Sequence, residues 1–137
     1  MNKIKYSLLA LLVFHLVSFG QSRNNIQKNS PIAWAKKMAD SDQKRNPNPV
    51  FLDFVTAPKW NYTHGLVTLA NQELYNYTKK EKYWQYGLSF ADQLIDKEGE
   101  ILGGYELEKY SLDLINSGKI LFEIYEKTGE SRYKIAM

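Results

Sequence analysis

The 137-residue sequence contains no cysteine. Disulfide bonds and a lipid anchor attached through cysteine are therefore excluded, and core packing alone must stabilise the folded chain. An excess of one charge is also lacking: without Lys3 and Lys5 of the N-terminal segment, the 18 basic residues become 16, against 15 acidic ones. This near balance does not indicate a basic surface for nucleic acid, so no nucleic-acid partner is expected.

Long hydrophobic runs are missing from most of the chain, and the exception lies near the N-terminus. The stretch SLLALLVFHLVSFG follows Lys3 and Lys5 and precedes a polar segment. This order is typical of a secretory signal peptide, and the apolar run is short for a membrane span of ~20 residues. We predict a signal peptide over 1–22, a linker over 23–30 and a folded portion over 31–137. We expect export to the periplasm or the extracellular space, without stable membrane association after cleavage.

Strand-like alternation of apolar and polar residues is also absent, which predicts an all-α fold. Apolar residues recur instead at spacings of three and four. The predicted helices begin at Pro31, with Ser30 as the cap, and then cover 64–77, 81–95 and 114–127. The glycine-containing turn over 96–105 has room for a short strand-like pair.

An internal repeat lies in the second half of the chain. LYNYTKKEKY (74–83) and IYEKTGESRY (124–133) are offset by 50 residues and share Tyr, Thr and Tyr at matching places. Each block joins the end of one helix to the start of the next, which predicts repeated helical hairpins. A period of this length favours a closed ring, the (α/α)6 barrel or toroid, which needs roughly 300 residues. We therefore expect this chain to be the truncated N-terminal part of a larger protein.

The loop KWNYTHG (59–65) gathers Trp60, Tyr62 and His64 just before a predicted helix. The two aromatic residues either plug the end of the hairpin or line a groove in which sugar rings stack. His64 is more typical of a solvated or capping residue than of a metal ligand. The only other histidine, His15, belongs to the predicted signal peptide, so a two-histidine metal site is excluded from the remaining chain.

Aspartate carries the other candidate chemistry. Asp113, in SLDLI, either caps the helix behind it, a role that Ser111 also suits, or takes part in proton transfer. Partial burial between Leu112 and Leu114 would favour proton donation by Asp113. A second pair, Asp40 and Asp42, lies two residues apart, so the two carboxylates point to different sides of a helix. That pair is better interpreted as a solvated helix end than as an acid/base pair.

The combination of KWNYTHGLV, LYNYTKKEKYWQYGLSFADQLID and YSLDLINSGKILFEIYEKTGESRYKIA resembles the unsaturated glycuronyl hydrolases. Glycoside hydrolase family 105, the unsaturated rhamnogalacturonyl hydrolases, is the most similar, and family 88 is second. The specific part is W-x-Y-x-x-G followed about fifty residues later by L-D-x-I-x-x-G. The resemblance spans about 32–136. One departure is Ser117: this chain has Asn116-Ser117-Gly118 where the family more commonly has Asn-Pro-Gly.

The resemblance implies an (α/α)6 barrel that removes a 4,5-unsaturated uronic acid from the non-reducing end of oligosaccharides released by polysaccharide lyases. In the implied reaction, an aspartate protonates the C4=C5 double bond and activates water, without a metal or organic cofactor. Asp113 matches one of two acidic residues of the family's pocket, and Trp60, Tyr62 and His64 match its substrate-binding edge. The family's principal acid/base motif, of the W-x-D-x-x-Y-M type, is absent here, so this segment alone is expected to be inactive.

Two alternatives remain open at this point. The chain could belong to a non-catalytic helical-repeat binding module, in which the aromatic residues only pack and Asp113 only caps. It could also belong to another carbohydrate-active enzyme with an (α/α)6 barrel, such as a lyase.

Overall fold

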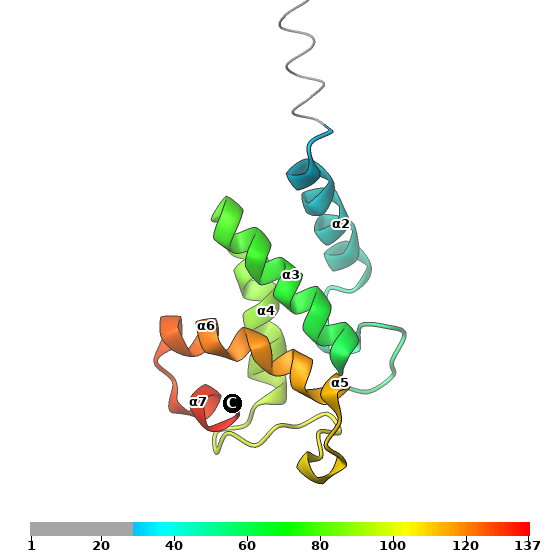
Figure 1. Cartoon of the computed structure of the whole chain (residues 1–137). Helices are drawn as coiled ribbons and strands as arrows, with labels where there is room; N and C mark the ends of the chain where they lie inside the picture. Colours follow the sequence, from blue (N-terminus) through cyan, green and yellow to red (C-terminus); the bar gives the residue numbers. More distant parts are fainter. Residues whose placement is uncertain (1–28) are drawn as a thin grey trace, which may run out of the picture. The chain divides into compact units, whose positions relative to one another are not determined.

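The computed structural model describes residues 29–137, and within them the regular structure is helical (Figure 1). Of the described residues, 29–38 belong to one unit and 39–137 to a second, compact one, which holds the candidate site described below. The predicted signal peptide lies outside the described residues, as does most of the predicted linker. The elements are α2 (Pro31–Arg45), η1 (Pro49–Phe51), α3 (Tyr62–Thr78), α4 (Glu81–Leu94), η2 (Leu107–Lys109), α5 (Leu112–Ile115), η3 (Asn116–Gly118), α6 (Lys119–Thr128) and α7 (Ser131–Ile135).

The first three predicted helices are confirmed to within two residues at their ends. Ser30 Oγ accepts a hydrogen bond from the Ala33 amide at the start of α2, as predicted. Helix α3 begins earlier than predicted, because the Asn61 side chain caps it by accepting from the His64 amide at 3.1 Å. Between α4 and η2, one antiparallel bridge joins Ile95 to Ile101, and this is the strand-like pair that the glycine-containing turn suggested.

The fourth predicted helix differs from the structure. It begins at Leu112 rather than at residue 114, and the 3-10 turn η3 separates the short α5 from α6. Gly118 lies at this junction, and glycine weakens a continuous helix because it has the greatest freedom in the unfolded chain. The break makes α5 a separate four-residue turn in front of α6.

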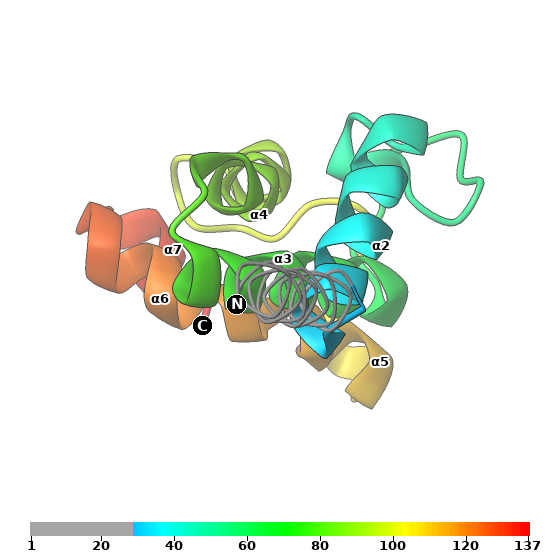
Figure 2. The ribbon, with the colours of Figure 1, turned by 90° about the horizontal axis from the view of Figure 1, so that it is seen from above.

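The core of the second unit forms where α3, α4 and α6 meet. Helix α3 contacts both α4 and the α5–α6 segment, which lie on different sides of it in Figure 2. The fully buried members include Trp60, Phe90, Leu94, Ile120, Leu121, Ile124 and Tyr133. Nonpolar burial of this kind contributes about 25 cal/mol per Å² removed from water, which makes this cluster the main source of stability.

The predicted 50-residue repeat is present in three dimensions. Thr78 Oγ1 donates to the Leu74 carbonyl and accepts from the Lys80 amide, and Thr128 does the same with Ile124 and Glu130. Both helices end in a left-handed residue whose amide donates to a tyrosine carbonyl four residues back. The two hairpin junctions therefore have the same hydrogen-bond pattern.

The repeat also includes a clasp formed by an aspartate, a tyrosine and a basic residue. Asp40 Oδ1 accepts from Lys82 Nζ at 2.5 Å and from the Tyr83 hydroxyl at 2.8 Å. In the next repeat Asp92 Oδ1 accepts from Arg132 and from the Tyr133 hydroxyl. Burial opposes the charged form of Asp40, but these hydrogen bonds hold the pKa of its carboxyl below the ordinary value. The clasps tie the C-terminal part of α2, which carries Asp40, to α4, and α4 to α7.

Replacing Tyr133 by phenylalanine tests the second clasp. Tyr133→Phe keeps the buried ring but removes the hydroxyl that donates to Asp92, and a lost hydrogen bond of this kind costs about 1 kcal/mol. We expect a lower melting temperature of the complete barrel that contains this chain, measured by circular dichroism, and a similar loss for Tyr83→Phe. Tyr77→Phe, at an exposed position, is the control. Equal melting temperatures for all variants would show that the clasps do not stabilise the fold.

Candidate active site

The structure brings together the two sequence motifs that lie about fifty residues apart. Trp60 Nε1 donates to the Leu114 carbonyl at 2.7 Å. Ser117 Oγ donates to the Asn61 carbonyl at 2.5 Å, and Asn116 Nδ2 donates to the Tyr62 carbonyl at 3.3 Å. Three consecutive residues at the start of α3 are thus bonded to the α5–η3 segment, which carries Asp113.

A close backbone approach accompanies these hydrogen bonds. A Cβ atom at Gly65 would lie 2.7 Å from both the Cα and the backbone nitrogen of Ser117. Real side chains do not occupy so small a space, so the glycine of W-x-Y-x-x-G is required where α3 meets η3. Here the departure at Ser117 adds a hydrogen bond, because proline has no hydroxyl to donate to Asn61.

Trp60 lies in the core, with 1% of its surface exposed. Its ring stacks on Phe90 with 5.4 Å between ring centroids, and its amide donates to the Gly103 carbonyl. Further hairpins packed on this unit would only increase that burial. The structure therefore corrects the prediction that Trp60 lines a sugar groove, and the alternative, in which it plugs the hairpin end, describes its position.

His64 is also buried, which corrects both its predicted solvated position and its predicted contact with substrate. Its Nδ1 lies 2.5 Å from Asn61 Oδ1, and its Nε2 lies 3.2 Å from the Val50 carbonyl. Burial lowers the pKa of His64, although the Val50 carbonyl and the charge of Asp53 act in the opposite direction. The ring joins the Pro49–Phe51 turn to the start of α3 and has no face open to a ligand.

Asp113 and Tyr62 are the predicted site residues that remain exposed. Tyr62 has 49% of its surface exposed, and Asp113 lies in the first turn of α5 beside Leu112, which is 80% exposed. The N-cap position belongs to Ser111, so the structure corrects the capping role of Asp113, while its partial burial in a complete barrel stays a prediction. Within the described residues the carboxylate makes no hydrogen bond or ion pair, and it is free to interact with a ligand.

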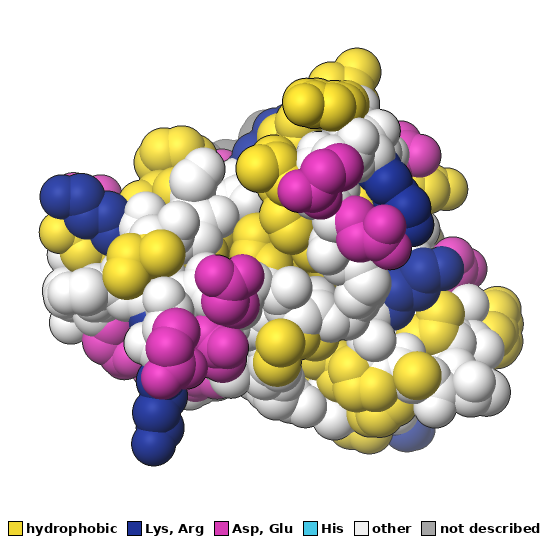
Figure 3. Space-filling model, turned by 90° about the horizontal axis from the view of Figure 1, so that it is seen from below, with side chains coloured by type: hydrophobic (Ala, Val, Ile, Leu, Met, Phe, Trp, Pro, Cys, Tyr) yellow, Lys and Arg dark blue, Asp and Glu magenta, His cyan; other side chains and the backbone are white. Residues whose placement is uncertain are grey.

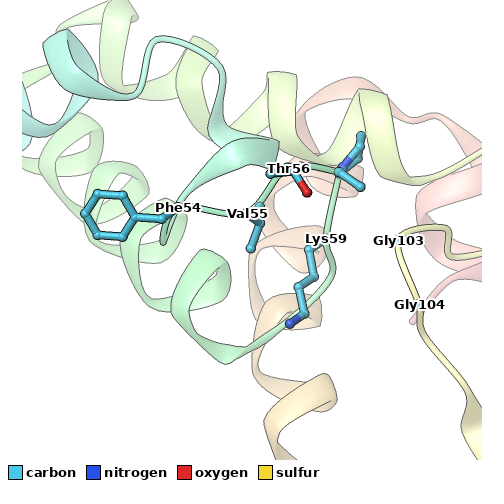
Figure 4. Close-up of a pocket in the computed structure, with 8 residues that line it drawn as sticks. Phe54, Val55, Thr56, Lys59, Gly103 and Gly104 are labelled. Atoms are coloured by element: carbon cyan, nitrogen blue, oxygen red, sulfur yellow. The ribbon is translucent and has the colours of Figure 1, made fainter.

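Two hollows lie near these segments. The first, of about 510 Å³, is open and lies between the loop 54–59 and Gly103–Gly104; Phe54 points away from those glycines in Figure 4. The second, of about 270 Å³, is lined by residues on both sides of Asp113, with Tyr105, Glu106, Leu107, Tyr110, Ser111, Leu112, Leu114 and Ile115 as its walls. Figure 3 shows a face of the molecule on which hydrophobic and acidic side chains are interspersed.

The other predicted carboxylates do not form a second catalytic pair. Asp40 is exposed, as expected of a solvated helix end, and it also belongs to the clasp with Lys82 and Tyr83. Asp42 Oδ1 accepts from Asn46 instead. Among residues 29–137, no group of three or more histidine, aspartate or glutamate side chains is arranged to hold a metal ion. In the same range, no helix is long and apolar enough to cross a membrane.

Sequence reasoning missed two polar residues of the site. Asn61 both caps α3 and accepts from the His64 ring, and an asparagine directly before a helix is a readable capping signal. Ser117 is fully buried and makes its hydrogen bond across 56 residues of sequence. Its side-chain type alone could not reveal that partner.

Comparisons with known proteins agree with this architecture. The sequence pattern of Glycosyl Hydrolase Family 88 matches residues 34–137. A solved structure of a glycoside hydrolase from family 105 of C. acetobutylicum ATCC 824 is similar, with a TM-score of 0.63 and 34% sequence identity. The match covers 75% of this chain and 26% of that one, so the chain spans about a quarter of the length of that structure.

The hairpins of this chain are thus part of the (α/α)6-barrel class of hydrolases, as the 50-residue repeat predicted. The chain belongs to Glycosyl Hydrolase Family 88. The resemblance to families 105 and 88, identified from the W-x-Y-x-x-G and L-D-x-I-x-x-G motifs, is confirmed by both comparisons.

Proposed function

We propose that this chain is part of a glycosidase that removes a 4,5-unsaturated uronic acid, galacturonyl or glucuronyl, from the non-reducing end of oligosaccharides. One observation carries the proposal: the three hydrogen bonds that join residues 60–62 to α5 and η3 hold the exposed Asp113 and the exposed Tyr62 on adjoining segments. An exposed carboxylate and an exposed aromatic ring on adjoining segments suit a sugar, whose polar groups and apolar C–H faces need different partners.

In the proposed reaction, a proton adds to C4 of the unsaturated sugar and the oxygen of a water molecule bonds to C5. The hemiketal formed at C5 then opens, and the aglycone sugar is released; one water molecule is consumed. Asp113 would be one of the two carboxyl groups that handle the proton and direct the water, and Tyr62 would border the bound ring. General acid/base groups typically accelerate such steps by about 100- to 10,000-fold.

The substrate class follows from this chemistry. A polysaccharide lyase creates a C4=C5 double bond when it cleaves a uronic-acid polysaccharide such as pectin, so its products are the proposed substrates. The N-terminal segment, with its basic start and apolar run, supports the further proposal that the protein is exported to the periplasm or the extracellular space.

The test requires a complete barrel, since the chain spans 26% of the matched structure. Residues 34–137 can replace the matching hairpins of the C. acetobutylicum relative, which also serves as the folded control. We expect this barrel to abolish the ultraviolet absorbance of an unsaturated disaccharide while leaving the saturated analogue intact. A folded barrel that cleaves only saturated glycosides would indicate another carbohydrate-active enzyme. A folded barrel without activity would favour the binding module.

A further inference from the structure

We infer that Trp60 is a positioning residue for Asp113, acting through the Leu114 carbonyl rather than through contact with a sugar. The inference rests on the proposed function, because that function gives Asp113 the catalytic role for which Trp60 would position it. The relevant contact is the 2.7 Å hydrogen bond from Trp60 Nε1 to the carbonyl of Leu114, the residue that follows Asp113 in the chain.

The turn that carries Asp113 has little stability of its own. Helix α5 has four residues, and no side chain caps its first turn. Leu112, Asp113 and Ile115 are exposed, so they contribute little packing. A helix this short is unstable in water unless other parts of the protein hold it. The position of the Asp113 carboxylate therefore depends on the bonds that fix α5 to the rest of the unit.

Trp60 is suited to fix this turn because its own position is rigid. The ring is buried against Phe90, and its amide donates to Gly103 at 2.9 Å. A Cβ at Gly103 would lie 2.8 Å from the Trp60 nitrogen, so the two backbones are in direct contact. The indole N–H is a donor with one fixed direction, and here it aims at α5. The packed core thus fixes, through Trp60, the turn that carries the exposed Asp113 carboxylate.

Two further hydrogen bonds join residues 61 and 62 to the segment that follows Asp113. Ser117 Oγ donates to the Asn61 carbonyl, and Asn116 Nδ2 donates to the Tyr62 carbonyl. Both lie on the C-terminal side of Asp113, as the Leu114 carbonyl does. The N-terminal side has no such tie from residues 60–62, so loss of the Trp60 bond would let the turn move about η3.

The test compares Trp60→Phe with Ile124→Val in the complete barrel. Trp60→Phe keeps an aromatic ring on Phe90 but removes the N–H donor. Ile124→Val removes a buried methyl group from the same core and leaves both the stack and the donor in place. We expect Trp60→Phe to lower kcat about 10- to 100-fold with KM changed less than twofold, because misplacing a catalytic group by about 1 Å has effects of this size. Ile124→Val should lower the melting temperature with kcat nearly unchanged.

Amide hydrogen exchange of the complete barrel gives a second readout that needs no substrate. Residues 112–116 should exchange faster in Trp60→Phe than in Ile124→Val, in solutions where both remain folded. Unchanged exchange there, equal losses of kcat in the two variants, or a rise in KM alone would each overturn the inference. Faster exchange in a barrel that has no activity on unsaturated sugars would support the positioning contact while rejecting the proposed function.

Discussion

Asp113→Asn in the complete barrel should lower turnover of an unsaturated disaccharide by about 100-fold or more while the fold is retained. An amide has nearly the size of a carboxylate, but it cannot take up and return a proton at neutral pH. Because general acid/base roles are worth about 100- to 10,000-fold, removing one of two cooperating carboxyl groups has a large effect on kcat. Loss of the ultraviolet absorbance of the conjugated double bond measures the rate.

The melting temperature should stay close to that of the unsubstituted protein. Asp113 is exposed and, within the described residues, makes no hydrogen bond or ion pair that asparagine would lose. Glu126→Gln removes one negative charge from an exposed position on α6 and is the matched control, with turnover expected within about twofold. Near-normal turnover of a folded Asp113→Asn barrel would contradict the catalytic role of Asp113.

Helix periodicity and the repeat at an offset of 50 residues were sufficient to predict the architecture. The pattern works because each hairpin buries one face, and burial imposes the three- and four-residue spacing of apolar positions. The clasps show why the repeat has matching tyrosines: Tyr83 donates to Asp40 on α2, and Tyr133 donates to Asp92 on α4. Local sequence could not reveal that pairing, since the partners lie 43 and 41 residues away.

The site was harder to predict than the fold, for a physical reason that Trp60 illustrates. An aromatic residue in a loop before a helix can face either solvent or core, and the sequence pattern is the same in both cases. The choice is made by Phe90, Gly103 and Leu114, which approach Trp60 only in the folded chain. Motif resemblance thus identified the right segments, but it assigned to Trp60 and His64 a contact with substrate that their burial excludes.

Gly65→Ala is expected to give the largest loss of stability among the substitutions considered. The added Cβ would lie 2.7 Å from the Cα and the nitrogen of Ser117, and 2.8 Å from its hydroxyl oxygen. Two of these are backbone atoms, which cannot turn aside as a flexible side chain can. Either α3 or η3 must move, and overpacking of this kind costs about 1–3 kcal/mol or more.

The same movement would separate the segments that carry Tyr62 and Asp113, so Gly65→Ala should also lower the activity of the complete barrel. Gly118→Ala is the matched control, because a Cβ there would meet no atom within 4 Å and the residue has a helical φ of −69°. Alanine at such a position stabilises by about 0.4–1 kcal/mol, through a smaller entropy of the unfolded chain. Chemical denaturation of the complete barrel measures both changes. Equal stabilities of the two variants would mean that α3 and η3 are not in the close contact that joins the two motifs.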